Sequence, residues 1–172
     1  MVKLWRCKIC GDAYIGAAAP TNCPFCGAKG KFIFKIQDVE VNFDVPLTET
    51  DKKNVEHALD VEVSNAEFYF CAAKKTPGIE AQKLFKTLGK VEAEHASIWK
   101  KILKLGKVPE GKEECSEEYT KNLEDSHAIE AKAIEFYKKA AEEADNERIK
   151  EIFEALVDVE LDHLKLSEER LK

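Results

Sequence analysis

The feature that most limits the fold of this chain is a motif, Glu-x-x-His, that occurs twice at an offset of 68 residues. Glu92 and His95 form the first copy, and Glu160 and His163 form the second. In a helix, the two residues of each copy lie one turn apart on the same face. The same offset, without a gap, matches further residues: Glu62 with Glu130, Tyr69 with Tyr137, Phe85 with Phe153, and Leu88 with Leu156. A two-helix unit is therefore used twice, which predicts two equivalent helical hairpins.

Start and stop signals divide the second part of the chain, residues 49–172, into four helices. The expected helices span residues 50–75, from the Thr76-Pro77 start signal to 104, from the Ser116 cap to 144, and from the Asp145 or Asn146 cap to the C-terminus. Short turns make each pair an antiparallel hairpin, about 50–104 and 116–172. The connection between the hairpins, ten residues or slightly more, can run along the bundle or join hairpins that pair with those of another chain. Both topologies stay open.

The four carboxylates of the repeat are expected to meet at one level. Each lies about 15 residues, or about 22 Å of helix, from its own turn, and each falls in an apolar stripe with its neighbours. Burying them without cations costs several kcal/mol each, so they must be paired or bind metal. One Glu on each of two helices and Glu-x-x-His on the other two is the ligand set of a di-iron or di-manganese bundle. The predicted ligands are Glu62, Glu92, His95, Glu130, Glu160 and His163.

The first 36 residues carry a different metal motif, two C-x2-C knuckles separated by 12 residues. Its members are Cys7, Cys10, Cys23 and Cys26. Such a pair of knuckles closes a tetrahedral four-thiolate site, and the glycines that follow, Gly11 and Gly27, suit the tight turns. We expect reduced thiolates rather than disulfides. The metal is iron, in a redox centre, or zinc, in a structural ribbon.

Charge differs sharply between the two parts. Residues 1–36 hold six basic groups against Asp12 alone, a net charge of +5, which leaves −11 for the remaining 136 residues. Opposite charges let the two parts attract each other, within or between chains. Weak nucleic-acid binding is the alternative use of the basic patch. We do not expect it, because no base-stacking platform or recognition helix accompanies the patch.

Residues 37–48 join the two parts. Val39, Val41, Phe43 and Val45 alternate with polar residues, which predicts a short, half-exposed strand. No apolar run is long enough to span a membrane, and no signal-peptide core follows Met1, so we expect a cytoplasmic protein without a membrane partner. Two further cysteines lie outside the motifs: Cys71 is interpreted as a packing residue and Cys115 as an exposed one.

The N-terminal residues Trp5-Arg6-Cys7-x-x-Cys10-Gly11, Ala19-Pro20 and Cys23-Pro24-x-Cys26-Gly27 resemble the rubredoxin-like domain of rubrerythrins. The resemblance covers nearly the whole chain, with the rubredoxin-like domain first rather than last, as in a reverse-order rubrerythrin. It implies a mainly α fold: a rubredoxin-like four-cysteine domain (1–36) with mononuclear iron, and a ferritin-like di-iron four-helix bundle (49–172). Trp5, Tyr14, Phe25, Phe32 and Phe34 are expected to form the core of the small domain.

The resemblance also implies roles within the bundle. Glu92 and Glu160 would bridge two irons, with manganese or zinc as alternatives, while Glu62 and Glu130 would be terminal ligands and each histidine would bind one metal. Tyr69 and Tyr137 are interpreted as donors to the ligands or as core aromatics. The usual Glu-x-x-Glu pair is missing, because Ala133 stands three residues after Glu130. His127, three residues before Glu130, is a core or supporting histidine, with a ligand role as the alternative.

The implied activity is that of an oxidoreductase, a non-haem di-iron peroxidase that reduces hydrogen peroxide to water and protects against oxidative stress. Electrons would arrive from an external donor, such as a rubredoxin or its reductase, through the four-cysteine iron. A ferroxidase or oxidase that uses dioxygen, and a non-catalytic zinc- or iron-binding protein, are the alternatives. A 36-residue domain on a short join is not expected to reach its own metal pair. We therefore expect a homodimer or larger, in which one chain's basic domain lies near another's acidic bundle.

Overall fold

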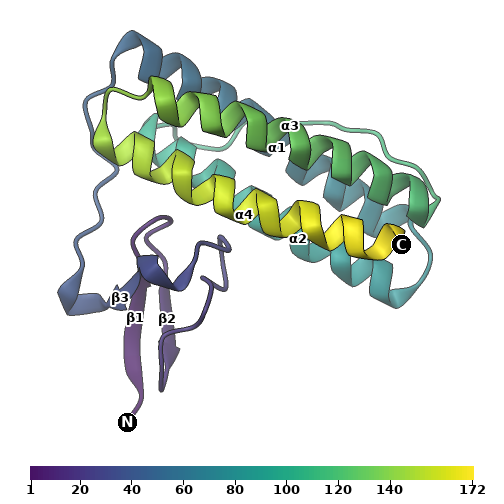
Figure 1. Cartoon of the computed structure of the whole chain (residues 1–172), viewed down its shortest axis with the longest axis horizontal. Coiled ribbons are helices and arrows are strands. Elements are labelled where there is room, and N and C mark those ends of the chain that lie inside the picture. Colours follow the sequence, from purple (N-terminus) through teal and green to yellow (C-terminus); the bar gives the residue numbers. More distant parts are fainter.

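A small β-sheet domain packs beside one end of a long four-helix bundle in the computed structural model, which describes all 172 residues (Figure 1). The fold class predicted from the sequence is confirmed: the chain is mainly α, with an N-terminal four-cysteine domain. No helix combines the length and the apolar character needed to cross a membrane.

The small domain is a three-stranded antiparallel sheet with the order β2-β1-β3. Its strands are β1 (Lys3–Cys7), β2 (Ala13–Gly16) and β3 (Ile33–Lys35), and two 3-10 turns, η1 (Gly30–Phe32) and η2 (Ile36–Asp38), flank β3. Its buried residues are the four cysteines with Ile9, Ala28 and Ile33. The predicted aromatic core is wrong in part, because Phe25 and Phe34 are 39% and 37% exposed. The knuckles themselves occupy the centre of so small a domain and leave little room for rings.

The join between the two parts, residues 39–48, is extended but pairs with no strand, so the predicted strand is wrong. The alternation of apolar and polar residues in the join nevertheless matches their burial. The odd-numbered residues from Val39 to Leu47 are half-buried, and the even-numbered ones are exposed. Phe43, Val45 and Leu47 pack against the main hydrophobic core, which is continuous from the cysteine knuckles into the bundle. The apolar face thus finds helices rather than a second strand.

The bundle consists of α1 (Glu49–Lys75), α2 (Ile79–Ile102), α3 (Tyr119–Glu143) and α4 (Glu147–Leu171). Thr48 caps α1 in a capping box with Asp51, and the Asn146 side chain caps α4. The second helix begins at Ile79, two residues later than the predicted start at Pro77. Thr76 ends α1, and Gly78, at a φ of 95°, precedes α2.

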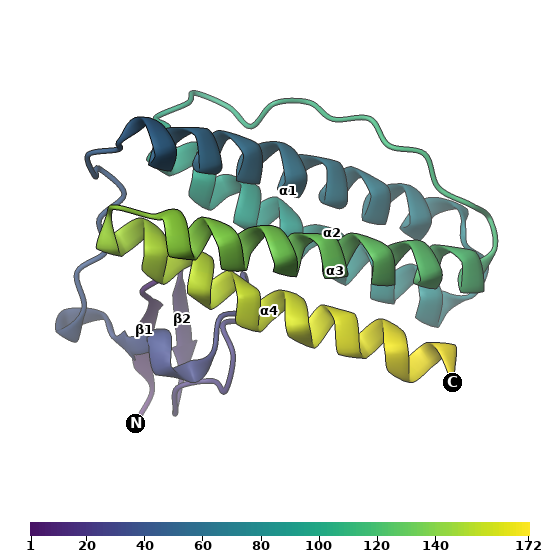
Figure 2. The ribbon, with the colours of Figure 1, turned by 45° about the horizontal axis from the view of Figure 1, so that its top comes forward.

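Both hairpins belong to one bundle within the chain, and of the two predicted topologies the structure has the one in which the connection runs along the bundle. Residues 103–118 return along the length of α1 (Figure 2). Gly111 packs on Val63, and the Ser64 hydroxyl donates a hydrogen bond of 2.6 Å to Glu113. The α1–α2 and α3–α4 pairs pack closely, whereas the two hairpins meet less tightly along α1 and α3.

A disulfide bond between Cys71 of α1 and Cys115 of the crossover fixes the far end of this connection. The interpretation of these residues as a packing residue and an exposed residue is therefore wrong; both are half-buried and bonded to each other. Next to the bridge, the buried Asn122 side chain donates to the Thr76 hydroxyl at 2.8 Å and to the Ser116 carbonyl at 2.9 Å. The crossover is thus attached covalently and by hydrogen bonds where α3 begins.

Replacing both residues, as in Cys71→Ser with Cys115→Ser, is expected to lower the free energy of unfolding. The bridge joins positions 44 residues apart, and a loop of that length is worth about 2–4 kcal/mol. Thermal unfolding of the oxidised protein and of the double variant measures the loss. A reductant should lower the melting temperature of the first and leave that of the variant unchanged. Equal melting temperatures for both oxidised proteins would contradict the prediction.

Candidate metal centres

The four cysteines of the small domain have the spacing of a tetrahedral metal site. Cys7 Sγ lies 3.8 Å from Cys26 Sγ, and Cys10 Sγ lies 3.7 Å from Cys23 Sγ. Four sulfurs at about 2.3 Å from a central metal stand about 3.8 Å apart, so the observed edges match. Gly11 and Gly27, at φ values of 87° and 74°, follow the two knuckles as predicted, and their amides donate to the Cys7 and Cys23 carbonyls.

The thiols of this site cannot all ionise without a cation. Hydrogen bonding to Cys10 is the largest influence on the pKa of Cys7 and of Cys23, and it lowers both. Hydrogen bonding to Cys23 raises the pKa of Cys10, and hydrogen bonding to Cys10 raises the pKa of Cys26. Two of the sulfurs therefore hold protons for the other two, and a bound metal ion would replace those protons.

The bundle brings the six predicted ligands together from all four helices, and all six are buried. They form two overlapping groups whose ligand atoms lie within 4.8 Å of one another: Glu62, Glu92, His95 and Glu160, and then Glu92, Glu130, Glu160 and His163. Glu92 and Glu160 belong to both groups. The repeat in the sequence thus appears in space as two half-sites that share two carboxylates.

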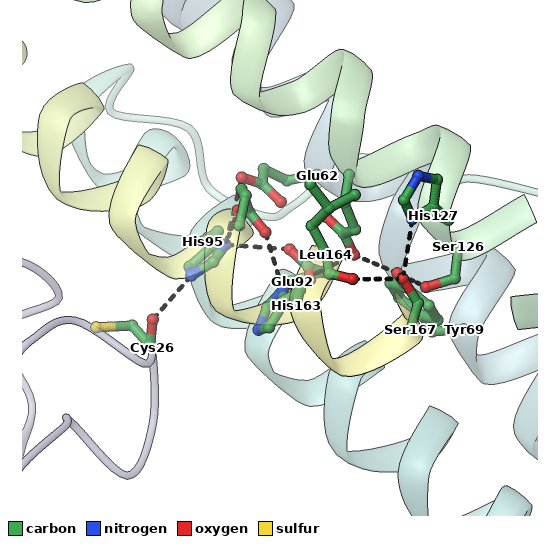
Figure 3. A network of polar contacts seen from close by, with 12 residues as sticks. Cys26, Glu62, Tyr69, Glu92, His95, Ser126, His127, His163, Leu164 and Ser167 are labelled. Atoms are coloured by element: carbon green, nitrogen blue, oxygen red, sulfur yellow. Dashed lines mark hydrogen bonds and ion pairs between the residues drawn. The ribbon is translucent and has the colours of Figure 1, made fainter. Parts of the chain in front are cut away.

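The Nδ1 atoms of the two imidazoles face equivalent sets of carboxylates (Figure 3). His95 Nδ1 lies 3.1 Å from Glu92, 3.3 Å from Glu160 and 3.3 Å from Glu62. His163 Nδ1 lies 2.9 Å from Glu160, 3.0 Å from Glu92 and 3.8 Å from Glu130. Glu92 and Glu160 each turn one oxygen to one imidazole and the other oxygen to its partner. A carboxylate in this position can bridge two cations.

Most of the facing atoms lack hydrogen-bond partners although they are close. Both Glu160 oxygens, one oxygen each of Glu62, Glu92 and Glu130, and His163 Nδ1 are buried without one. His163 Nδ1 approaches Glu92 within 3.0 Å, yet the two are not aligned as donor and acceptor. Lone pairs that converge on one space and leave each other unsatisfied fit bound cations. Four carboxylates also carry the charge that neutralises two divalent ions.

Without metal, protons hold this cluster together. Burial raises the pKa of Glu62 and of Glu130 well above the ordinary value. Burial opposes the charged form of His95 and His163 as well, but the facing carboxylates, Glu62 first for His95 and Glu92 first for His163, raise the pKa of both imidazoles. Metal ions must displace such protons, so the affinity of this site for metal falls as the pH falls.

Two buried tyrosines donate hydrogen bonds to Glu130 and Glu62 across the bundle. Tyr69 of α1 donates to Glu130 of α3 and lies 2.8 Å from the Ser126 hydroxyl, while Tyr137 of α3 donates to Glu62 of α1. Each tyrosine therefore serves the opposite hairpin rather than the glutamate of its own helix. Tyr69 and Tyr137 are therefore core aromatics and hydrogen-bond donors at once, because both rings are fully buried and both hydroxyls bind a carboxylate.

The remaining candidate histidines do not join the cluster. His127 is half-buried, and its Nδ1 lies 3.5 Å from the Ser167 hydroxyl, so the geometry gives no support to its alternative role as a ligand. His57 is exposed and packs edge-on against Phe136, with ring centroids 4.5 Å apart. Ala133 is buried and offers no donor atom.

The second ring nitrogen of His95 links the two metal sites. His95 Nε2 lies 2.9 Å from the backbone carbonyl of Cys26, drawn as a dashed line in Figure 3. A carbonyl only accepts, so Nε2 carries the proton and Nδ1 keeps its lone pair for a metal. One hydrogen bond thus connects the backbone of Cys26, in the small domain, to the imidazole of His95 in the bundle.

Ion pairs and hydrogen bonds hold the small domain against α2 and α4. Lys8, Lys29 and Lys31 pair with Glu151, Asp162 and Asp158 of α4, and Lys101 of α2 donates to the Cys10 carbonyl at 2.9 Å. The expectation that the domain cannot reach its own bundle is wrong, because the extended join spans the distance. The oligomeric state stays a prediction.

Two features of this interface have no signal in the sequence. Gly27 faces Val159 so closely that a Cβ atom on it would lie 2.8 Å from Val159 Cγ1. Glu94 lies against Asp12 of the small domain; burial, and then the Asp12 charge, raise the pKa of Glu94 to about 7. Neither contact follows from a motif, since each depends on how the two domains dock.

Comparison with known proteins agrees with both sites. The sequence matches the family described as Rubrerythrin over residues 53–165. The chain belongs to the rubrerythrin family. Residues 5–33 match the rubredoxin-like domain of rubrerythrins, so the reverse domain order indicated by the motifs is confirmed.

Other comparisons bear on the fold alone. This rubrerythrin resembles the crystal structure of a ferritin-like, di-iron-carboxylate protein from Bacillus anthracis str. Ames, with a TM-score of 0.60 and 24% sequence identity. The match covers 73% of this chain and 100% of that one. No curated protein matches the sequence significantly.

Removing one tyrosine hydroxyl is expected to weaken metal binding. Tyr137→Phe takes the donor from Glu62, and Tyr69→Phe takes it from Glu130. Loss of such a supporting contact typically costs about 10–100-fold in metal affinity. Competition with a chelator measures the affinity of the bundle site, and Tyr14→Phe, in the small domain, is the control. Unchanged affinity in both bundle variants would contradict the assignment.

Proposed function

We propose that this rubrerythrin is a non-haem di-iron peroxidase that reduces hydrogen peroxide to water. In this proposal Glu92 and Glu160 would hold both metal ions, Glu62 and Glu130 would each hold one as terminal ligands, and His95 and His163 would each bind one. The four cysteines hold a single iron. Two iron ions held by these residues would supply the two electrons that split peroxide, and an iron held by the four cysteines would replace them one at a time. Two protons complete the two waters.

The observation that carries the proposal is the hydrogen bond from His95 to the Cys26 carbonyl. It continues the covalent path from Cys26 Sγ through the backbone to the imidazole whose Nδ1 faces Glu62, Glu92 and Glu160. A structural zinc ribbon has no need of such a path. The buried surroundings of His95, which is fully inaccessible, keep water away from this connection.

Anaerobic mixing of the fully reduced, iron-loaded protein with hydrogen peroxide tests the proposal. Both iron centres should oxidise within milliseconds to seconds, and the red colour of ferric tetrathiolate should report the four-cysteine site. A parallel experiment with dioxygen separates the peroxidase from the oxidase or ferroxidase alternative. Faster oxidation by dioxygen would replace the proposal with that alternative. Native protein that contains only zinc, and stays colourless, would rule out both.

Electron delivery within one chain is tested by exchanging charges across the domain interface. Lys29→Glu with Lys31→Glu should slow the re-reduction of the bundle metals through the four-cysteine iron, because both new carboxylates face Asp162 and Asp158. The effect should shrink as the ionic strength rises. Adding Asp158→Lys and Asp162→Lys restores the opposite charges and should restore the rate. A rate that the first pair of substitutions leaves unchanged would contradict delivery through this docked arrangement.

A further inference from the structure

The face of the bundle opposite the small domain carries a pocket of about 420 Å³ between α1 and α3. The small domain covers the α2–α4 side, and both ribbon views leave α1 and α3 on the other side (Figures 1 and 2). Val61, Ile129 and Phe136 form apolar walls, and the exposed Lys132 and His57 stand at the rim.

The floor of this pocket adjoins the proposed metal site. Asn65 and Ala133 line the pocket, and both are buried, with exposed fractions of 6% and 2%. They are equivalent positions of the repeat, three residues after Glu62 and Glu130. Residues three apart on a helix are neighbours, so the lining residues Asn65 and Ala133 lie next to Glu62 and Glu130. The small side chain of Ala133 leaves space that a longer residue would fill.

The amide of Asn65 has an unmet need for a partner. Its Nδ2 is buried and makes no hydrogen bond. A buried donor left without an acceptor costs about 1–3 kcal/mol, and such groups in native proteins usually meet water or a ligand. An oxygen atom that enters between Asn65 and Ala133 would accept this hydrogen bond and lie next to the carboxylate cluster.

The size and lining of the pocket select a ligand larger than hydrogen peroxide. A water molecule occupies about 30 Å³ in the liquid, and peroxide is little larger, so one molecule of either would contact only a small part of the lining. Apolar walls above a polar floor suit an apolar body with an oxygen-rich end. We propose that the pocket binds organic hydroperoxides, with the alkyl or aryl part against Val61, Ile129 and Phe136 and the hydroperoxy group at Asn65.

This proposal rests on the proposed peroxidase function and extends its substrate class. The O–O bond of the hydroperoxide breaks, and two electrons and two protons convert it into one alcohol and one water. The electrons come from the external donor through the four-cysteine site, on the opposite face of the bundle. Substrate and electrons thus approach from different sides, and neither has to displace the small domain.

Rates of oxidation by two peroxides test the pocket. Cumene hydroperoxide and hydrogen peroxide should both oxidise the reduced, iron-loaded protein. Ala133→Phe fills the floor, and Val61→Phe fills the pocket from its half-buried wall in case the first variant does not fold. Each should slow oxidation by cumene hydroperoxide about tenfold or more, with a much smaller effect on hydrogen peroxide. Ala128→Phe, at a position of α3 outside the pocket, is the control.

Binding of the product alcohol gives a readout that does not depend on turnover. Adding 2-phenyl-2-propanol to the zinc-loaded protein should shift the NMR signals of the Asn65 side-chain amide and the Ala133 methyl group, and Val61→Phe should abolish the shifts. Oxidation by hydrogen peroxide but not by cumene hydroperoxide overturns the proposal, as does an equal effect of the filling variants on both oxidants. If hydrogen peroxide also fails, the proposed function falls, and the alcohol shifts alone decide whether the pocket takes an organic ligand.

Discussion

Four carboxylates buried around two imidazoles are the interaction on which the rest of this structure depends. Glu62 and Glu130 are fully inaccessible, and burial raises the pKa of both. Such a cluster is costly unless protons or cations balance it. The bundle offsets part of that cost symmetrically: Glu62 and Glu130 each accept a hydrogen bond from a tyrosine hydroxyl of the opposite hairpin. The two hairpins are thereby held in one register, because Tyr69 and Tyr137 reach their partners only when the four carboxylates share a level.

The position of the small domain follows from the same cluster. The Nδ1 atom of His95 faces the carboxylates, so its Nε2–H group needs an acceptor on the other side. The backbone carbonyl of Cys26 is that acceptor. Gly27 permits this approach, since a side chain there would collide with Val159. The lysines that pair with α4 add little energy individually, but they orient a basic domain on an acidic helix. The His95 hydrogen bond is thus one of several that fix the docking, together with Lys101 to the Cys10 carbonyl and the shared hydrophobic core, and Gly27 permits the close approach.

What the sequence could predict depends on whether a feature is periodic. The cluster of six buried carboxylate and imidazole residues follows from an offset and a helical repeat, so Glu62 and Glu130 could be found although neither belongs to the Glu-x-x-His motif. The disulfide bond could not be predicted, because Cys115 lies in an irregular crossover whose course does not follow from a repeating pattern in the sequence. The carboxylate partners of the two tyrosines could not be predicted for a related reason: spacing along one helix says nothing about which neighbouring helix lies opposite. The alternation of residues 39–45 correctly indicates half-burial, yet burial against helices leaves the same pattern as a strand.

The repeat is symmetric in its predicted ligands but not in the residues around them, and in the proposed function that difference gives the two half-sites different tasks. Only His95 contacts the small domain; His163, its equivalent, has an exposed fraction of 8%. Likewise Asn65 and Ala133 are equivalent positions, and only one of them carries a polar group. Two identical hairpins would offer no direction to a reaction. In the proposed function, the docked domain on α2 and α4 marks the side from which electrons arrive, and the Asn65 amide and the open pocket on α1 and α3 mark the side of the substrate.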